Sequence, residues 1–236
     1  MSTLPFSGKL ALVTGASRGI GAATAEALAA AGAHVILTAR TSGGLEEVED
    51  RIHKAGGHAT IAPLDLIDGE SIGRLAQAIS GRWQALDILV LNAATLGSLA
   101  SVPAIDAKEF ARLLTLNIAA PQALIAAFDG MLRASGDARV VALTSSVGTQ
   151  PRAYWGAYGA SKAALETLVN AYGEEVKNIS AIRTHIVDPG ATRTAMRARA
   201  FPGEDPSTLK EPAVVAQAIV ELAVADTPTG SRIRVD

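Results

Sequence analysis

Short apolar runs alternate with longer stretches of helical periodicity from one end of the chain to the other. The apolar runs cover residues 10–13, 34–38, 60–63, 88–91, 140–144, 184–187 and 233–235. They lack the strict apolar–polar alternation of half-exposed strands, and strands that are apolar on both faces are typical of a parallel sheet covered by helices on both sides. The pattern therefore predicts a mostly or fully parallel sheet of seven strands.

The stretches between these runs have apolar positions three and four residues apart, as amphipathic helices do. They cover residues 20–31, 45–55, 70–79, 106–132, 158–177 and 212–225, and glycines at 32, 56 and 57 are placed to end two of them. Alternating strands and helices predict an α/β, Rossmann-type doubly wound sandwich with right-handed crossovers. No repeat, low-complexity tract or linker divides the chain, so we expect one domain over residues 1–236.

One segment breaks the alternation. Residues 189–212 hold four prolines, two glycines and four arginines or lysines directly after a predicted strand. Long irregular segments in compact domains are usually functional loops. We therefore expect a mobile loop over a substrate site at about residues 189–212.

Composition narrows the class of partner. The formal net charge is −2 and no basic run occurs, which argues against a nucleic-acid surface. The chain has no cysteine, so disulfides and thiolate metal sites are excluded, and its four histidines lack the close pairing of a zinc helix. A small-molecule partner and no metal are the expectation.

Nothing in the sequence predicts export or membrane insertion. The only basic residue within positions 1–9 is followed by four apolar residues, too few for a signal-peptide core. The longest apolar-rich span, residues 22–39, is interrupted by Glu26, Gly32 and His34, which indicates a helix, a turn and a strand. We expect a cytoplasmic protein without membrane contact.

The first predicted strand runs into Thr14-Gly-Ala-Ser-Arg-Gly-Ile-Gly21, which opens a helix. A glycine-rich turn lets backbone N–H groups approach a pyrophosphate, and the helix N-terminus adds partial positive charge. Glycines alone also fit a tight packing turn, but the strand before and the helix after are the context that a dinucleotide site requires. The residues expected to bind a dinucleotide in this turn are Gly15, Ser17, Arg18, Gly19, Ile20 and Gly21.

Tyr158 and Lys162 stand four residues apart, which places a phenol and an ammonium on one face of a predicted helix. The pair favours proton-transfer chemistry. A solvated amphipathic edge gives the same spacing, so the interpretation depends on what else the chain supplies.

With these motifs the chain resembles the short-chain dehydrogenase/reductase family over essentially its whole length. Residues 14–21 resemble the family's cofactor turn, and Tyr158-x-x-x-Lys162 resembles its active-site motif. Asn92-Ala-Ala94 is similar to its Asn-Ala-Gly segment, with Ala94 in place of the usual glycine. Pro189-Gly190 is similar to its late cofactor loop.

The resemblance also implies a polar pair, Asn117 and Ser145. Twelve residues separate Ser145 from Tyr158, as in the family pattern, and this spacing selects Ser145 over Ser146. The expected catalytic residues are Asn117, Ser145, Tyr158 and Lys162.

Carbonyl reduction requires a proton source and a hydrogen-bond donor where hydride transfer leaves negative charge on oxygen. Tyr158 is the expected acid and Ser145 the expected donor to the substrate oxygen. A nearby ammonium favours phenolate, so Lys162 is expected to lower the pKa of Tyr158. By the resemblance, Lys162 also holds the nicotinamide ribose.

The position of Asn117 before a proline indicates a role independently of the resemblance. It falls within a predicted helix, four residues before Pro121, and proline has no N–H to donate to the Asn117 carbonyl. A carbonyl freed in this way is suited to an ordered water in a proton relay from Lys162 to solvent. The alternative is a simple proline kink without a role.

Charge indicates which dinucleotide is bound. An acidic residue about 20 positions after the glycine turn binds the adenosine ribose diol in folds of this kind. No acid stands there; Arg40 lies 19 residues after Gly21, and Arg18 lies inside the turn. Two guanidiniums would favour a 2′-phosphate, so NADP(H) is the preferred cofactor and NAD(H) remains possible. The alternative is that both arginines only face solvent.

Further cofactor contacts are expected outside the turn. Asp65 resembles the family position that binds the adenine amino group, although it would equally cap the helix starting near Asp68. The remaining expected cofactor residues are Leu66, Asn92, Ala93, Tyr158, Lys162, Pro189, Gly190, Thr192 and Thr194.

The substrate is less constrained. Tyr154, Trp155 and Tyr158 fall within five positions and predict an apolar pocket wall, which Met196 and Phe201 would close. The three arginines of the loop, at 193, 197 and 199, would meet an anionic substrate, the cofactor phosphate or only water.

A homodimer or homotetramer is expected from the second face of the helix at 158–177. This face carries Ala164, Thr167, Leu168, Ala171 and Tyr172, small and apolar enough for helix pairing. It would equally pack on the sheet.

The sequence thus predicts an NADP(H)-dependent oxidoreductase that interconverts a carbonyl and an alcohol on a small or medium organic substrate. The alternative is a non-catalytic NADP-binding regulatory or scaffold protein, because fold alone does not establish function. A sugar-nucleotide epimerase or dehydratase would need a larger substrate domain than 236 residues leave.

Overall fold

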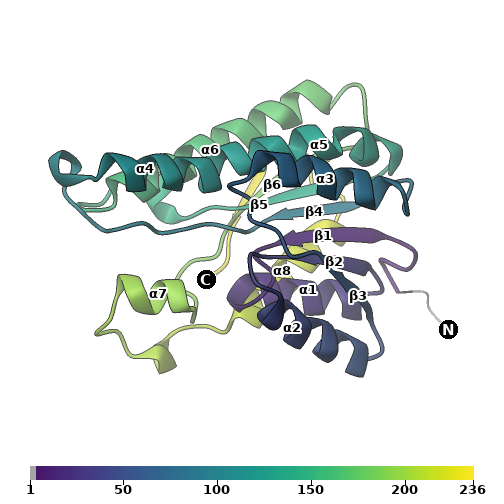
Figure 1. Cartoon of the computed structure of the whole chain (residues 1–236), viewed down its shortest axis with the longest axis horizontal. Helices are drawn as coiled ribbons and strands as arrows, with labels where there is room; N and C mark the ends of the chain where they lie inside the picture. Colours follow the sequence, from purple (N-terminus) through teal and green to yellow (C-terminus); the bar gives the residue numbers. More distant parts are fainter. Residues whose placement is uncertain (1–3) are drawn as a thin grey trace.

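The computed structural model describes residues 4–236; Met1–Thr3, which belong to the N-terminal segment assessed for an export signal, lie outside the described residues. Seven strands form one parallel sheet in the order β3-β2-β1-β4-β5-β6-β7 (Figure 1). The strands are β1 (Leu10–Thr14), β2 (His34–Thr38), β3 (His58–Ile61), β4 (Ile88–Leu91), β5 (Arg139–Leu143), β6 (Arg183–Asp188) and β7 (Ser231–Arg234). The predicted parallel α/β fold is confirmed.

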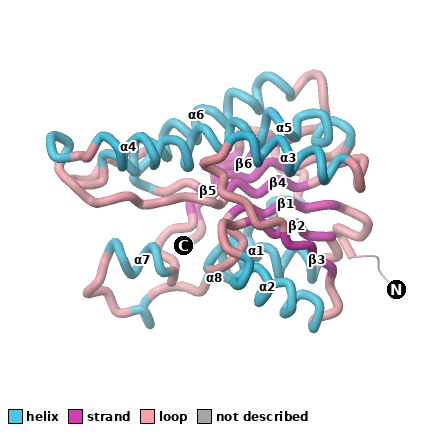
Figure 2. Tube along the Cα trace, viewed as in Figure 1, coloured by secondary structure: helices cyan, strands magenta, loops and turns pink. Residues whose placement is uncertain are grey.

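Helices cover both faces of this sheet, as Figure 2 shows with helices in cyan around magenta strands. The helices are α1 (Gly19–Ala30), α2 (Ser42–Lys54), α3 (Gly69–Ser80), α4 (Ala107–Leu114), α5 (Ala120–Ala134), α6 (Gly156–Val176), α7 (Ala195–Ala200) and α8 (Pro212–Val224). Apolar side chains of α1, α2 and α8 bury one sheet face, and those of α3, α5 and α6 bury the other. The apolar character of both strand faces follows from this double cover.

The strand order reverses direction between β1 and β4. The chain first runs outward from β1 to β3, and then crosses to β4 on the other side of β1. Ligands of open α/β sheets bind in the crevice at the carboxyl ends of the strands where such a reversal occurs. The glycine turn after β1 and Asn92 after β4 therefore lie at the expected binding position.

The predicted strand boundaries agree with the structure within two residues. The largest difference is in β3, which begins at His58 rather than at residue 60, because His58 pairs with His34 of the neighbouring strand. His58 is exposed at this edge of the sheet, so its polarity concealed the start of the strand.

The prediction of a single helix over residues 106–132 is wrong for the middle of this range. Residues Thr115–Ala119 form a π-helical turn that separates α4 from α5. Pro121 lies in the first turn of α5 and cannot donate to an α-helical partner one turn earlier. The interruption that proline predicted is therefore present, as a π turn rather than a kink.

Residues Ala107–Ala134 together are long and apolar enough, by length and composition, to cross a membrane, and within residues 4–236 no other helix meets this test. In the fold, Leu124, Ile125 and Phe128 of this stretch pack into the core on one sheet face. The sheet therefore accounts for part of its apolar character.

The proline-rich segment 189–212 contains more structure than a loop. It includes α7, a 3-10 turn at Pro206–Thr208, and a parallel bridge between Thr192 and Lys210. Figure 1 shows it as an excursion near the C-terminus, away from the two helix layers. The expectation of an irregular loop is therefore wrong for this segment. Its mobility stays a prediction.

The helix face expected to pair subunits is partly turned inward. Tyr172 is buried and its hydroxyl donates to Asp129 at 2.7 Å, while Leu168 packs against the core. Thr167 and Ala171 remain exposed. The packing alternative therefore holds for part of this face.

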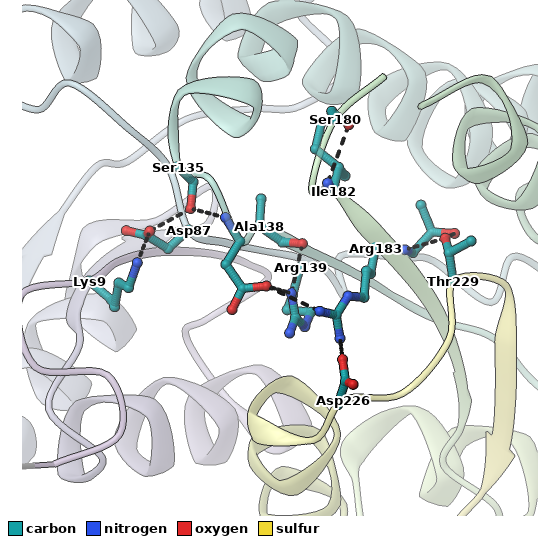
Figure 3. Close-up of polar contacts among 12 residues, drawn as sticks. Lys9, Asp87, Ser135, Ala138, Arg139, Ser180, Ile182, Arg183, Asp226 and Thr229 are labelled. Atoms are coloured by element: carbon teal, nitrogen blue, oxygen red, sulfur yellow. Dashed lines mark hydrogen bonds and ion pairs between the residues drawn. The ribbon is translucent and has the colours of Figure 1, made fainter. Parts of the chain in front are cut away.

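A polar cluster closes the amino-terminal edge of the sheet, opposite the glycine turn (Figure 3). The Asp87 carboxylate accepts from Lys9 Nζ at 2.9 Å, from the Leu10 N–H at 2.8 Å and from Ser135 Oγ at 2.6 Å. Arg139 and Arg183 face each other across β5 and β6, and both guanidiniums reach acidic side chains. Ion pairs therefore link neighbouring segments at this edge.

His185 lies two residues after Arg183 on the same sheet face and is fully buried. Neither ring nitrogen has a hydrogen-bond partner among the described residues. Burial, assisted by the positive charges of Arg139 and Arg183, lowers the pKa of His185 to about 4. The folded protein therefore holds this imidazole neutral.

The free energy of unfolding should fall in acid because of His185. The folded pKa lies below the ordinary value of about 6.5, so the stabilisation is complete above pH 6.5 and is lost as pH falls toward 4, by up to about 3 kcal/mol. His185→Leu should flatten denaturant-measured stability over this range, whereas exposed His53→Gln should not. Equal pH slopes in the wild type and His185→Leu would contradict the assignment.

Candidate active site

The glycine turn between β1 and α1 has a backbone that side chains would not permit. Gly15 and Gly19 have φ values of +66° and +57°, in the left-handed region. Gly21 has no such angle, but a Cβ on it would lie 2.2 Å from the Gly15 carbonyl oxygen. The first two glycines are therefore needed for conformation, and the third for close packing.

Asn92 at the end of β4 holds this turn in place. Its amide Nδ2 donates to the carbonyls of Thr14 and Gly15, at 2.8 and 3.3 Å. The Thr14 hydroxyl accepts from the N–H groups of Asn92 and Ala93 and donates to the Val90 carbonyl. The two strand ends at the reversal point are thus joined by side-chain hydrogen bonds.

The turn retains groups that a pyrophosphate would use. Helix α1 begins after Arg18 without a side-chain cap, and no acidic residue lies in its first turn. A Cβ on Gly19 would lie 3.5 Å from the Thr194 side chain, so the late segment 189–194 reaches the turn from the opposite side. The predicted residues Gly19 and Thr194, 175 positions apart in the chain, therefore lie next to each other.

Tyr158 and Lys162 are brought to the carboxyl edge of the sheet by the first turns of α6. Both side chains are buried, with 7% and 2% of their surface exposed. Lys162 Nζ lies 5.7 Å from the centre of the Tyr158 ring and donates to the Leu143 carbonyl at the end of β5, at 2.8 Å. The pair is thus a buried site, and the solvated-edge alternative does not hold.

The direction of the Tyr158 pKa corrects the sequence expectation. Burial raises the pKa of Tyr158 above its ordinary value, and the negative charge of Asp188 raises it further. Burial also lowers the pKa of Lys162 to about 8, partly offset by Glu166. The expected lowering of the Tyr158 pKa is therefore wrong for this structure, because burial is the largest cause of the shift and Asp188 adds to it.

Asn117 lies in the π turn and is 1% exposed. Its Oδ1 accepts from the Thr95 N–H at 2.9 Å, and its Nδ2 donates to the Thr95 carbonyl and to Ser161 Oγ, at 2.9 and 3.0 Å. The side chain therefore ties the segment after β4 to α6. The side chain is thus occupied, so the predicted role in proton transfer is left to the backbone carbonyl. That role stays a prediction.

Ser145 follows β5 by two residues, next to the strand end that binds Lys162. Its side chain lines a cavity of about 230 Å³ between the segment after β5, α7 and β7. Ser146 also lines this cavity, while its carbonyl accepts from Thr149 and Gln150 in a short 3-10 turn. The structure thus brings Ser145 to the predicted edge.

Arg18 and Arg40 come from neighbouring loops. The Ala16 N–H donates to the Thr38 carbonyl at 3.1 Å, so the glycine turn and the end of β2 are adjacent. Both arginines are exposed, and neither pairs with an acid among residues 4–236. Two unpaired guanidiniums therefore flank the region beyond β2.

Asp65 does not cap α3. Its Oδ1 accepts from the Ile67 N–H at 3.1 Å, and the cap is Asp68, which accepts from the Glu70 N–H. Leu66 is buried in the core on one sheet face. The capping alternative for Asp65 is wrong, which leaves its second carboxylate oxygen free for a ligand.

The late segment is held by its own hydrogen bonds. Gly190 has a φ of +59°, and its N–H donates to Asp188 Oδ1 at 3.1 Å. The Thr192 hydroxyl donates to the Pro189 carbonyl at 2.8 Å, and the Thr194 hydroxyl caps α7. These predicted residues therefore form a preorganised turn.

The three arginines of this segment all have protein partners. Arg193 pairs with Glu211, Arg197 makes two bonds to Glu204, and Arg199 donates to the Gly97 carbonyl at 2.6 Å. Phe201 packs on Trp155, with ring centres 5.6 Å apart, and Met196 packs beside Tyr158. Met196 and Phe201 thus pack against the aromatic residues, while Tyr154 stays 64% exposed; their closing of a substrate pocket stays a prediction.

Sequence reasoning missed a charged group behind the Tyr–Lys pair. Glu166 accepts from Thr144 Oγ1 at 2.5 Å and pairs with Arg232 of β7 at 3.3 Å. Arg232 also lies 3.5 Å from Asp188, which is 2% exposed. Asp188 directly follows the apolar residues Ile186 and Val187 at the end of β6, a signal that could have marked it, whereas Arg232 joins the group only through strand order.

This geometry at the carboxyl edge of the sheet places the protein among nucleotide-dependent oxidoreductases of the α/β class. The chain matches the family model for short chain dehydrogenases over residues 9–205, and it belongs to that family. The chain is 38% identical over 208 residues to the uncharacterized oxidoreductase YciK of Escherichia coli (strain K12). This match covers 87% of the chain and 82% of the relative.

Other similar proteins are also described as reductases or dehydrogenases. A fatty acyl-CoA reductase of Acinetobacter baylyi is 38% identical over 171 residues, 72% of this chain and 58% of that protein. A short chain dehydrogenase from Escherichia coli CFT073, complexed with NADPH, is 35% identical with a TM-score of 0.94, and each chain is covered fully. One from Pseudomonas syringae has a TM-score of 0.95 at 35% identity, covering 100% of this chain and 97% of that one.

Gly21→Ala should lower the free energy of unfolding by roughly 1–3 kcal/mol, because the added methyl meets backbone that cannot move cheaply. Gly73→Ala is a matched control: it also lies within a helix, where nothing surrounds an added Cβ, and it should raise stability by about 0.5–1 kcal/mol. Urea unfolding measures both. Equal effects of the two substitutions would show that the turn is not closely packed.

Proposed function

We propose that this protein is an NADP(H)-dependent oxidoreductase that interconverts a carbonyl and an alcohol on a small or medium organic substrate. The observation that carries the proposal is the burial of Tyr158 and Lys162 side by side at the edge of the sheet where the glycine turn also lies. A buried phenol and ammonium without a structural salt bridge are costly, and such groups mark functional sites.

In this proposal the bound dinucleotide supplies or accepts the hydride. Ser145 donates a hydrogen bond to the substrate oxygen, and Tyr158 gives that oxygen its proton. Lys162 holds the ribose, and the turn residues hold the pyrophosphate. Exclusion of water by the closed aromatic wall of Trp155 and Phe201 strengthens each of these interactions.

The raised pKa of Tyr158 suits it to act as the proton donor. The phenol stays protonated at neutral pH, as a proton donor must. The alkoxide that hydride transfer leaves on the substrate is a stronger base than phenolate, so proton transfer to it is downhill. In the reverse reaction, alcohol oxidation, the phenolate would act as the base.

Proton return to Tyr158 is assigned to Lys162 and the backbone at Asn117. A Lys162 pKa of about 8 lets the ammonium give up and regain a proton near neutral pH. The π turn at Asn117 is where the helical hydrogen-bond ladder is interrupted, which supports the proposed water-binding carbonyl.

Cofactor preference rests on Arg18 and Arg40. Their guanidiniums are unpaired within the described chain and flank the end of β2, where a 2′-phosphate would lie. The structural relatives complexed with NADP or NADPH support the same preference. NAD(H) remains the alternative cofactor.

The rival is a non-catalytic NADP-binding regulatory or scaffold protein of the same fold. A carbonyl and alcohol panel, followed by NADPH absorbance, separates the two. Turnover of any carbonyl supports the enzyme, whereas tight NADPH binding with inactivity across a broad panel supports the rival. A cytoplasmic location and a homodimer or homotetramer are further proposals, and sedimentation showing a strict monomer would remove the latter.

Tyr158→Phe should lower kcat at least about a hundredfold, because it removes the proton donor while keeping the ring volume. The dissociation constant for NADPH, measured by fluorescence, should stay nearly unchanged. Tyr172→Phe is the matched control: it loses only the bond to Asp129 and should keep its kcat. Retained turnover in Tyr158→Phe would exclude Tyr158 as the acid.

Arg40→Asp should reduce the ratio of kcat/KM for NADPH to that for NADH by about 10- to 100-fold, the loss expected for one charged hydrogen bond. The new carboxylate would also repel the 2′-phosphate. Arg74→Asp on the remote helix α3 removes the same charge and should leave the ratio unchanged. An unaltered ratio in Arg40→Asp means that this arginine only faces solvent.

A further inference from the structure

The cavity beside Ser145 has an unusual lining for a neutral carbonyl compound. Its volume is about 230 Å³, and three arginine side chains reach it from separate elements: Arg152 from the segment before α6, Arg197 from α7 and Arg234 from β7. Small-molecule sites are usually lined mostly by apolar side chains with few polar groups. Three arginines around so small a cavity are therefore unusual.

Two of these arginines are held by acids outside the lining. Glu204 binds Arg197 through Nε and Nη2, at 2.6 and 2.5 Å, and Asp236 binds Arg234 through Nε at 2.7 Å. Neither acid lines the cavity. The other guanidinium nitrogens of these two arginines have no further acidic partner among residues 4–236. They are Nη1 of Arg197 and both Nη atoms of Arg234.

Arg152 has no acidic partner within the described chain. Its guanidinium carbon lies 5.8 Å from the Trp155 ring centre and 5.9 Å from that of Phe201. Arg197 lies over the same Phe201 ring at 3.8 Å. The aromatic side chains therefore orient two guanidiniums without neutralising either of them.

One carboxylate also lines the cavity, and its charge is already matched. Asp188 Oδ1 accepts from the Gly190 N–H, and Oδ2 lies 3.5 Å from Arg232, which is outside the lining. Arg232 also pairs with Glu166. Among the charged residues that line the cavity, Arg152 is therefore the one without an oppositely charged partner within residues 4–236.

We propose that this cavity binds a carboxylate of the substrate, so that the protein acts on carbonyl compounds that carry a carboxylate group. This inference rests on the proposed function. Ser145, which lines the same cavity, holds the carbonyl end, and the guanidiniums hold the acid end. The planar fork of arginine matches a carboxylate in two parallel bonds, which a neutral ester or amide does not offer. Arg152 is the specificity-determining residue, because no protein acid competes for it.

Binding alone tests the cavity without turnover. Benzoate and the neutral benzamide, titrated calorimetrically into the full chain with NADP⁺, have similar shapes and differ in charge. Benzoate should bind at least about tenfold more tightly, and Arg152→Gln should weaken benzoate about 10- to 100-fold with little effect on benzamide. Arg152→Lys keeps the charge but loses the fork and should be intermediate.

Arg193→Gln is the matched control. Arg193 lies in the same late segment as Arg197 but outside the cavity lining, and it pairs with Glu211. It should leave benzoate binding unchanged. Thermal unfolding of each variant confirms folding, which exposed Arg152 should not disturb.

Turnover gives the second measurement. The wild type should reduce 4-carboxybenzaldehyde with a kcat/KM at least about tenfold above that for its neutral methyl ester, and Arg152→Gln should equalise the two. Equal kcat/KM values in the wild type, with benzoate bound no better than benzamide, would overturn the carboxylate site and leave the proposed function intact. Reduction of neither aldehyde, nor of any panel carbonyl, would count against the proposed function, while the titrations still decide the cavity.

Discussion

The Thr14 hydroxyl at the reversal of strand order is the contact on which the site depends. It is 1% exposed, donates to the Val90 carbonyl and accepts from the N–H groups of Asn92 and Ala93, so one buried oxygen joins the ends of β1 and β4. Asn92 then binds the Thr14 and Gly15 carbonyls at the start of the turn. Because parallel strands end at the same edge, this junction sets both the glycine turn after β1 and the start of the segment that leads from β4 to α4. Loss of any member would leave a buried polar group unpaired.

Three residues after Asn92, at Thr95, begins a set of hydrogen bonds that reaches the proposed acid. Asn117 binds both backbone groups of Thr95 and the Ser161 hydroxyl, and Ser161 in turn donates to the Tyr158 carbonyl at 2.7 Å. The path links three segments that are far apart in sequence, so the positions of the cofactor turn and of Tyr158 are set together. The role given to Asn117 from its proline neighbour therefore has a second part: the side chain positions α6, and only the backbone carbonyl is left for proton transfer.

Desolvation is the dominant electrostatic effect at the site. It raises the pKa of Tyr158 and lowers that of Lys162, so each group is pushed toward its neutral form. Glu166 opposes this for Lys162 and Asp188 adds to it for Tyr158, and Arg232 of the last strand lies against both acids. Charge at the centre of the site is thus compensated from β7, whereas Arg152 beside the Ser145 cavity has no acidic partner within residues 4–236. In our proposals, proton transfer belongs to the first region and substrate recognition to the second.

The sequence alone determined the elements and their order, because a fully covered parallel sheet requires apolar strands and covering helices in alternation. It also predicted the turn glycines and the Tyr158–Lys162 pair from local spacing, and Ser145 from its resemblance to the family pattern. Only the tertiary structure decided the π turn, the α7 helix and the direction of the Tyr158 pKa, since these depend on burial and on distant neighbours. The partners Glu166, Asp188 and Arg232 meet only when β7 pairs with β6, and the arginines around the cavity come from three separate elements. Such contacts have no periodic or local signal, and packing alone creates them.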